Sequence, residues 1–226
     1  EPVYHPFRKM IDFNDRQTII SELKMDDQGI YRMDLDQVLK LIFKHEIKMV
    51  VFCSPHNPVG RVWTISELKG LADLCKRHDV ILISDEIHMD FVFAPHKHHM
   101  LFDLDPSYKE FVITLISASK TFNLADLHTS QIIVFNKDHT RSIWREFEKM
   151  GMTGVNGWGQ AAHKAAYLYG DAYVDAMIQQ IAANRDLVIK QLNKHHSKIK
   201  VIDHQGLYVL WLDFRAYQKE QSEIKD

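Results

Sequence analysis

Hydrophobic residues in this chain gather in short runs that are separated by segments with helical spacing. Four runs are rich in valine and isoleucine and almost continuously apolar; they cover residues 47–53, 80–84, 111–117 and 131–135. Strands that are buried on both faces have this pattern, because helices cover both sides of their sheet. The pattern predicts an α/β fold with a mixed, mostly parallel sheet.

Segments with helical periodicity separate and follow these runs. Residues 64–78 carry apolar side chains at helical spacing, and Ser66 is a suitable N-cap residue. The order strand, helix, strand predicts a right-handed crossover. We expect further helices over 138–150, 156–169 and 171–195, and two short strands over 200–203 and 207–213.

The long helix 171–195 suggests that the chain contains parts of two domains. On this interpretation residues 1–180 form a large domain, and residues 181–226 begin a smaller α+β domain. The chain starts at Glu1, within a segment over 2–7 that resembles an extended strand, and it ends on charged residues after a strand. We therefore expect both domains to continue beyond the present sequence.

Composition and charge narrow the classes of function. The chain has 226 residues with 28 Lys and Arg against 30 Asp and Glu, a formal net charge of −2 that provides no basic field for nucleic acid. No apolar run approaches the roughly 18 to 20 residues of a membrane-spanning helix. Cys53 and Cys75 are far apart in sequence, as is typical of reduced thiols. We expect a cytoplasmic protein without nucleic-acid or membrane partners.

Three polar side chains follow buried strands at the positions where ligands bind in open α/β sheets. Asn57 follows the first strand, Asp85 the second and Lys120 the third. Each residue type by itself is usually solvated surface. Their shared position at the ends of strands of one sheet predicts instead that they meet at one site.

An amide, a carboxylate and an amine around one site suit pyridoxal 5′-phosphate. This cofactor needs a carboxylate against its ring nitrogen, a role that fits Asp85. The Lys120 amine could attach the cofactor covalently and later move the Cα proton of a substrate. Asn57 could donate to the phenolic oxygen, and Ser117 could offer its hydroxyl to the phosphate.

Three motifs strengthen this interpretation: SPHNPVGRVW at 54–63, SDEIH at 84–88 and SASKTFN at 117–123. Together they resemble the fold type I pyridoxal-phosphate enzymes of the class I/II aminotransferase superfamily, most of all the branch of cystathionine β-lyases and cysteine C–S lyases. Weaker similarity extends over nearly the whole chain, including residues 206–213. The resemblance implies a three-layer large domain and a homodimer with a small amino-acid substrate.

The resemblance also assigns roles to single residues. It implies that Lys120 carries the cofactor, that Asp85 pairs with the pyridine nitrogen and that Asn57 bonds the phenolic oxygen, aimed by a constrained or cis peptide before Pro58. Tyr4 falls where the family stacks an aromatic ring on the cofactor, and Ser117 falls at a phosphate contact.

Other positions depart from the family pattern. His88 replaces a tyrosine, His128 replaces a phosphate-binding arginine, and Asp126 replaces a glycine near the lysine loop. The family's phosphate loop and its carboxylate-binding arginine are expected outside this chain, which by itself should turn over little substrate.

The predicted function is a pyridoxal-phosphate C–S β-lyase that acts on cystathionine or related cysteine S-conjugates. It would release a thiol, pyruvate and ammonia. An aminotransferase with the same cofactor contacts is the first alternative, and a non-catalytic or regulatory member of the fold is the second.

Several other side chains have simpler interpretations. His96, His98 and His99 lack the partners and spacing of a metal site, and we expect them in a solvated loop. Trp63 is expected to pack behind the Asn57 turn. The aromatic residues over 143–178 suit a helical core or a dimer surface.

Overall fold

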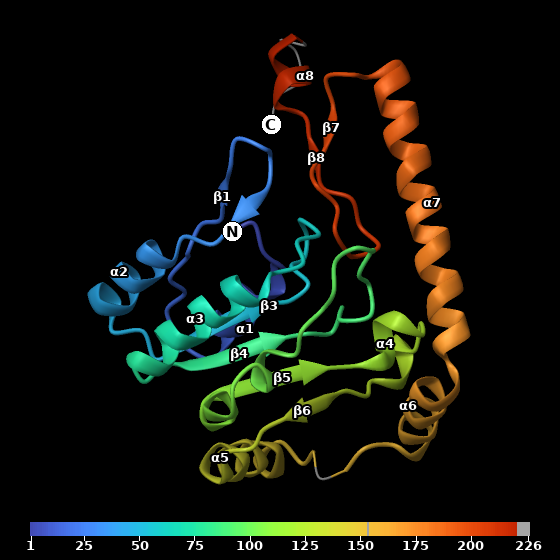
Figure 1. Cartoon of the computed structure of the whole chain (residues 1–226). Coiled ribbons are helices and arrows are strands. Elements are labelled where there is room, and N and C mark those ends of the chain that lie inside the picture. Colours follow the sequence, from blue (N-terminus) through green and yellow to red (C-terminus); the bar gives the residue numbers. More distant parts are fainter. Residues whose placement is uncertain (153, 221–226) are drawn as a thin grey trace.

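The computed structural model describes residues 1–152 and 154–220, and a four-stranded sheet lies at its centre (Figure 1). The strands of this sheet are β3 (Met49–Cys53), β4 (Ile81–Asp85), β5 (Val112–Ile116) and β6 (Gln131–Ile133), in that order. The first three run parallel, and β6 runs antiparallel to β5. The predicted mixed, mostly parallel sheet is therefore confirmed.

The helices and two short strand pairs surround this sheet. The helices are α1 (Pro6–Phe13), α2 (Leu35–His45), α3 (Ile65–Arg77), α4 (Ala118–Thr121), α5 (Lys137–Lys149), α6 (Gly157–Tyr169), α7 (Asp171–His195) and α8 (Arg215–Glu220). Short 3-10 turns cover Leu101–Asp103, Pro106–Glu110 and Ala125–Leu127. The strand pairs are β1 (Lys24–Met25) with β2 (Tyr31–Arg32), and β7 (Lys200–Val201) with β8 (Leu212–Asp213).

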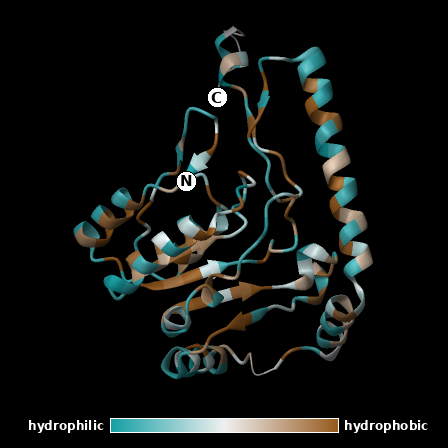
Figure 2. Cartoon of the chain, viewed as in Figure 1, coloured by the Kyte–Doolittle hydropathy of each residue, from teal (hydrophilic) through white to brown (hydrophobic). Residues whose placement is uncertain are grey.

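The hydrophobic core lies between the sheet and helices α2 and α3. Figure 2 shows the strands of the sheet as mostly hydrophobic. The core contains buried side chains from α2 and α3, from the strands, from the 3-10 turns and from the adjoining loops; they are Ile42, Phe52, Trp63, Leu68, Leu71, Ala72, Leu74, Cys75, Val80, Leu82, Leu101, Tyr108 and Val112. Because this core fixes the strands, it also fixes the loops at their carboxyl ends.

Helix α3 begins two residues earlier than its proposed cap implies. Thr64 is the N-cap: its hydroxyl accepts from the Glu67 amide at 3.2 Å, and the Glu67 carboxylate accepts from the Thr64 amide at 2.9 Å. This reciprocal pair is a capping box. The prediction of Ser66 as N-cap is wrong, since Thr64 already satisfies the first turn.

Both ends of the described chain differ from the sequence-based prediction. Helix α1 begins at Pro6, so the segment over 2–7 is not extended throughout, and α2 was not predicted. Near the other end, β7 and β8 are shorter than the expected strands over 200–203 and 207–213. The strands shorten because residues 204–207 turn away and bond to the segments at 60 and 91–93.

Helix α7 spans 171–195 as predicted and runs up one side of the molecule to the β7–β8 pair (Figure 1). The division of the chain at residue 180 remains a prediction. Within the described ranges, none of the helices is both long enough and apolar enough to cross a membrane.

Candidate functional site

The carboxyl ends of β3 and β4 bring Asn57, Asp85 and His88 to one edge of the sheet. Asp85 is the last residue of β4 and pairs in register with Cys53, the last residue of β3. The amide of Asn57 and the Nε2 atom of His88 are 3.5 Å apart. Two residues that are 31 positions apart in sequence therefore lie together at this edge of the sheet.

The turn that carries Asn57 is tightly constrained. The Asn57–Pro58 peptide is cis, as the resemblance implied, and so is Ser54–Pro55. The His56 amide donates to the Arg61 carbonyl at 2.8 Å, and Gly60 reaches a φ of +74° that favours glycine. Trp63 lies buried behind the turn, and its indole N–H donates to the Cys53 carbonyl at 2.9 Å.

Lys120 lies on α4, directly after β5, and its side chain is exposed. Its positive charge influences the pKa values of Asp85 and His88. Burial raises the pKa of Asp85 above the ordinary range, and the Lys120 charge opposes that rise. Burial, assisted by Lys120, lowers the pKa of His88 to about 4, so His88 is neutral at pH 7. The charge of the amine thus acts on both the carboxylate and the imidazole.

Tyr208 is a site residue that the sequence-based prediction missed. Its ring lies 5.6 Å from the His88 ring and 4.9 Å from that of Phe91, both in edge-on geometry. Burial and the neighbouring Tyr4 raise the pKa of Tyr208. Tyr4 itself is 40% exposed. The similarity over 206–213 was the only signal in the sequence for Tyr208, and it did not indicate which face of the segment meets the site.

The Ser117 hydroxyl is already engaged within the protein. It donates to the Thr129 carbonyl at 2.8 Å and accepts from the Ser119 amide at 3.0 Å as the N-cap of α4. Its single proton is therefore in use, and a phosphate contact stays a prediction. His128 and Asp126 are both exposed beside this segment.

One histidine of the 96–99 segment differs from its expected place. His98 is only 10% exposed and lies 2.6 Å from the fully buried carboxylate of Glu86. Glu86 also accepts from the Ser84 hydroxyl at 2.8 Å and from the Leu101 amide at 3.2 Å. The prediction of a solvated loop is thus wrong for His98, because the buried carboxylate next to Asp85 needs its N–H donor.

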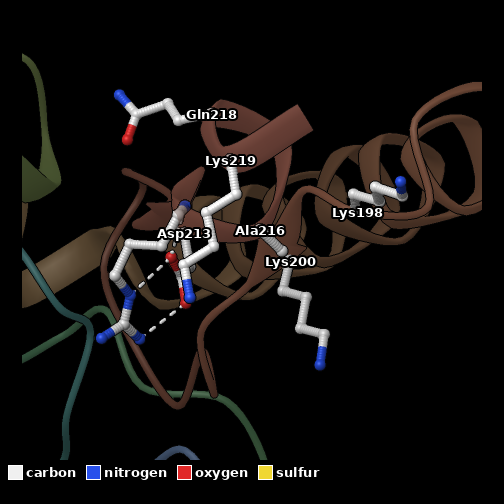
Figure 3. Close-up of a pocket in the computed structure, with 7 residues that line it drawn as sticks. Lys198, Lys200, Asp213, Ala216, Gln218 and Lys219 are labelled. Atoms are coloured by element: carbon white, nitrogen blue, oxygen red, sulfur yellow. Dashed lines mark hydrogen bonds and ion pairs between the residues drawn. The ribbon is translucent and has the colours of Figure 1, made fainter. Parts of the chain in front are cut away.

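A separate surface pocket of about 640 Å³ lies among the residues around β7, β8 and α8 (Figure 3). It is lined by Lys198, Lys200, Asp213, Arg215, Ala216, Gln218 and Lys219. Arg215 engages Asp213 there and lowers its pKa to about 2. As far as the described residues go, this lining includes none of the predicted site residues, so the chemistry belongs to the sheet edge.

The site also fits the cofactor expected from the sequence. Among the described residues, the Asp85 carboxylate accepts one hydrogen bond, from the Ile87 amide at 3.1 Å. The Nδ1 atom of the buried His88 is without a partner there. A partly buried carboxylate that accepts a single hydrogen bond has the acceptor capacity that a protonated pyridine ring requires.

An open α/β sheet with these groups beyond its carboxyl ends defines the class of pyridoxal-phosphate transferases and lyases. The family model described as "Aminotransferase class I and II" matches residues 1–224, and the chain belongs to this family. Cystathionine beta-lyase PatB of Bacillus subtilis (strain 168) is 31% identical over 99% of this chain and 58% of its own length. Protein MalY of Escherichia coli (strain K12) is 31% identical over 99% of this chain and 57% of its own length.

Solved structures agree with this assignment. Cystalysin from Treponema denticola, which contains a pyridoxal 5′-phosphate cofactor, superimposes with a TM-score of 0.92 at 33% identity, over 98% of this chain and 57% of its own. The PLP-bound C–S lyase from Staphylococcus hominis gives a TM-score of 0.90 at 33% identity, over 99% and 56%. The predicted superfamily and its C–S lyase branch are confirmed. The chain spans a little over half the length of these relatives.

Proposed function

We propose that the full-length protein is a pyridoxal-phosphate-dependent C–S β-lyase. Its substrates would be cystathionine or related amino acids with sulfur at Cβ. The proposal is carried by the position of Asn57, Asp85 and Lys120 after three separate strands of one sheet, together with the approach of Asn57 to His88 and the effect of the Lys120 charge on Asp85. The relatives named cystathionine β-lyase and C–S lyase support the choice of reaction.

Each site residue has a distinct task in this reaction. When bound, the cofactor supplies an electron sink for the charge left on Cα. Asp85 would hold a proton at the ring nitrogen, and Asn57 would donate its amide N–H to the phenolic oxygen. Lys120 would hold the cofactor through its amine and would later remove the Cα proton of the substrate. Loss of the thiol from Cβ, followed by hydrolysis, then gives pyruvate and ammonia.

His88 and Tyr4 complete the proposed site. The neutral His88 imidazole approaches the Asn57 amide and maintains its orientation. Tyr4 stacks on the cofactor ring from the segment before α1, where it is exposed enough to meet a ligand. Ser117 acts chiefly through its cap on α4, which orients the turn over 117–121 that carries Lys120 (the lysine turn). The phosphate contact implied by the family would require the Ser117 hydroxyl to turn away from the Thr129 carbonyl.

The decisive experiment supplies L-cystathionine to the full-length protein without a keto acid and measures pyruvate. We expect pyruvate release and a visible cofactor absorbance, both of which disappear in Lys120→Ala. Lys190→Ala, at an exposed position on α7, is the matched control and should retain both. An unchanged absorbance in Lys120→Ala would end the assignment of the cofactor lysine.

An aminotransferase is the second candidate. Kynurenine–oxoglutarate transaminase 3 of Rattus norvegicus is 40% identical over 88 residues, which is 39% of this chain. Lyases and aminotransferases share the removal of the Cα proton and differ in which atom is protonated next. Amino-group transfer to a keto acid, with no pyruvate from cystathionine alone, would favour this candidate.

We also propose a cytoplasmic homodimer. Large aromatic side chains are exposed on α6 and at its end, where Trp158 is 83% and Tyr169 82% exposed. Exposed aromatic residues of this size are enriched at protein interfaces. Analytical ultracentrifugation of the full-length protein should give twice the monomer mass, and Trp158→Glu should shift it toward the monomer.

A further inference from the structure

The turn over 204–207 is held between the two segments that carry Asn57 and His88. The amides of Gln205 and Gly206 both donate to the Gly60 carbonyl at 3.0 Å. On the other side, the Phe93 amide donates to the Gln205 carbonyl, and the Leu207 amide to the Phe91 carbonyl, each at 2.9 Å. Backbone groups of one short turn thus join the Asn57 turn to the segment after His88.

The Gln205 side chain adds a second connection to the Asn57 turn. Its Oε1 atom accepts from the Arg61 guanidinium at 2.7 Å and from the Val62 amide at 2.9 Å. Its Nε2 atom donates to Asp203 at 2.6 Å. Gln205 is buried, as is Arg61, which is 3% exposed. The side chain therefore uses both the oxygen and the nitrogen of its carboxamide to fix one position of the turn.

The fit between the two turns leaves little room for displacement. A Cβ atom added at Gly60 would lie 2.8 Å from the His204 ring and 2.9 Å from the Gly206 carbonyl oxygen. A Cβ atom at Gly206 would lie 2.4 Å from the Phe91 carbonyl oxygen. Because backbone meets backbone here, a shift of the 204–207 turn must move the Asn57 turn as well.

We infer that Gln205 is a positioning residue that sets the Asn57 amide at the site through Arg61 and Val62. The inference rests on the proposed function, in which Asn57 bonds the cofactor. Gln205 itself has no part in the chemistry. Its effect passes through the turn over 56–62. We call the contacts of residues 204–207 with this turn and with residues 91–93 the Gln205 clamp. The clamp also places Tyr208 beside the His88 ring.

The test uses the full-length protein and Gln205→Met, which keeps the side-chain length but removes both acceptor contacts. We expect the dissociation constant for pyridoxal 5′-phosphate to rise by about tenfold, as for the loss of one hydrogen bond to a charged group. The pH midpoint of the bound-cofactor absorbance should move in the direction seen in Asn57→Ala. Gln179→Met, at an exposed position on α7, is the control and should match the wild type.

A double-mutant cycle separates positioning from general damage. If Gln205 acts through Asn57, Gln205→Met should add less than about twofold to the dissociation constant in an Asn57→Ala background. Gln205→Glu combined with Asp203→Asn retains an acceptor oxygen for Arg61 and Val62, avoids placing two carboxylates side by side, and should restore most of the affinity. Full additivity of the Gln205→Met and Asn57→Ala losses, or an Asp203→Asn/Gln205→Glu protein weaker than Asp203→Asn by as much as Gln205→Met is weaker than the wild type, would overturn the inference.

Amide hydrogen exchange provides a measurement that does not need the cofactor. In the cofactor-free protein, Gln205→Met should accelerate exchange at Val62 and Gly60, far from position 205 in sequence, and Gln179→Met should not. Unchanged exchange at these amides would refute the clamp. Failure of the wild type to bind the cofactor would instead refute the proposed function, and the exchange result would still decide on the clamp.

Discussion

Asp85 places a carboxylate in surroundings that favour its neutral form. Burial raises the pKa of this group, while the Ile87 amide and the Lys120 charge act in the opposite direction. The native state therefore holds the proton more tightly than the unfolded state does. It follows that ionisation of Asp85 above its unfolded pKa costs stability in the cofactor-free protein, and that this cost persists at pH 7.

Asp85→Asn should therefore stabilise the cofactor-free protein while it weakens cofactor binding. We expect a gain of about 1 kcal/mol in the free energy of unfolding at pH 7, as for other sites where function conflicts with stability. Urea denaturation of the full-length protein measures the gain, and cofactor titration measures the lost affinity. Asp175→Asn, at an exposed position on α7, is the control. A less stable Asp85→Asn protein at pH 7 would contradict this account.

The location of the main site residues could be predicted because each follows a recognisable apolar run. The shared position of Asn57, Asp85 and Lys120 after strands of one sheet indicated a common site, whereas their separate roles came from the resemblance of the motifs around them and remain predictions. Tyr208 and His98 could not be found in this way. Tyr208 is placed by its contact with His88, and His98 by its contact with Glu86. The hydrophobic periodicity of a segment does not predict such tertiary contacts.

At the scale of elements, the short helix α4 depends on its neighbours to hold Lys120 in place. Ser117 caps it, and the Nε2 atom of His163 on α6 accepts from the Ala118 amide at 2.8 Å. His163 is 5% exposed, so water has little access to this bond. A four-residue helix has little stability of its own, and these contacts therefore orient the lysine turn.

His163→Ala should destabilise the full-length protein by about 1 to 3 kcal/mol, because it leaves a buried amide without an acceptor. Loss of cofactor affinity should accompany the loss of stability, since α4 carries Lys120. Chemical denaturation and cofactor titration measure the two effects. His195→Ala, at the exposed end of α7, should leave both unchanged. Wild-type stability in His163→Ala would show that α6 does not support the lysine turn.

The helices and strands were predicted best where the hydrophobic pattern of their own residues identifies them. Helix α7 has the predicted bounds, and the four central strands differ only at their ends, because buried strands and long helices carry continuous patterns. The strands β7 and β8 were predicted too long. The apolar residues of these strands continue into the 204–207 turn, whose hydrogen bonds go to the Gly60 carbonyl and to the 91–93 segment. The hydrophobic pattern of the sequence cannot distinguish such a turn from a strand that is paired in a sheet.

At the scale of the whole molecule, three buried histidines make stability depend on pH. Burial lowers the pKa of His56, His88 and His204 from 6.5 to about 4. His56 lies in the Asn57 turn, His88 follows β4, and His204 lies in the 204–207 turn. Their protonation therefore depends on the folding of all three segments that the Gln205 clamp joins. In the native protein each is neutral near pH 7, whereas in the unfolded chain each takes up a proton below about pH 6.5.

The sign of the pH dependence follows from these lowered pKa values. Above about pH 6.5 both states are neutral at these positions, and the histidines contribute no pH dependence. As the pH falls from about 6.5 toward 4, the unfolded state binds protons that the native state does not, so the free energy of unfolding should decrease by a few kcal/mol. Urea denaturation of the cofactor-free, full-length protein at intervals from pH 8 to pH 4.5 measures this decrease.

Replacing one of the three histidines identifies the source of the decrease. In the native protein, the His56 ring lies 2.7 Å from the Pro2 carbonyl oxygen, and a glutamine amide at this position could still donate to it. His56→Gln should therefore remove about a third of the decrease between pH 6.5 and 4.5 without loss of the fold. The exposed His195→Gln should keep the wild-type profile. If stability instead stays constant down to pH 4.5 in the wild type, the buried histidines are already protonated in the native state, and the neutral imidazole assigned to His88 beside Asn57 would have to be abandoned.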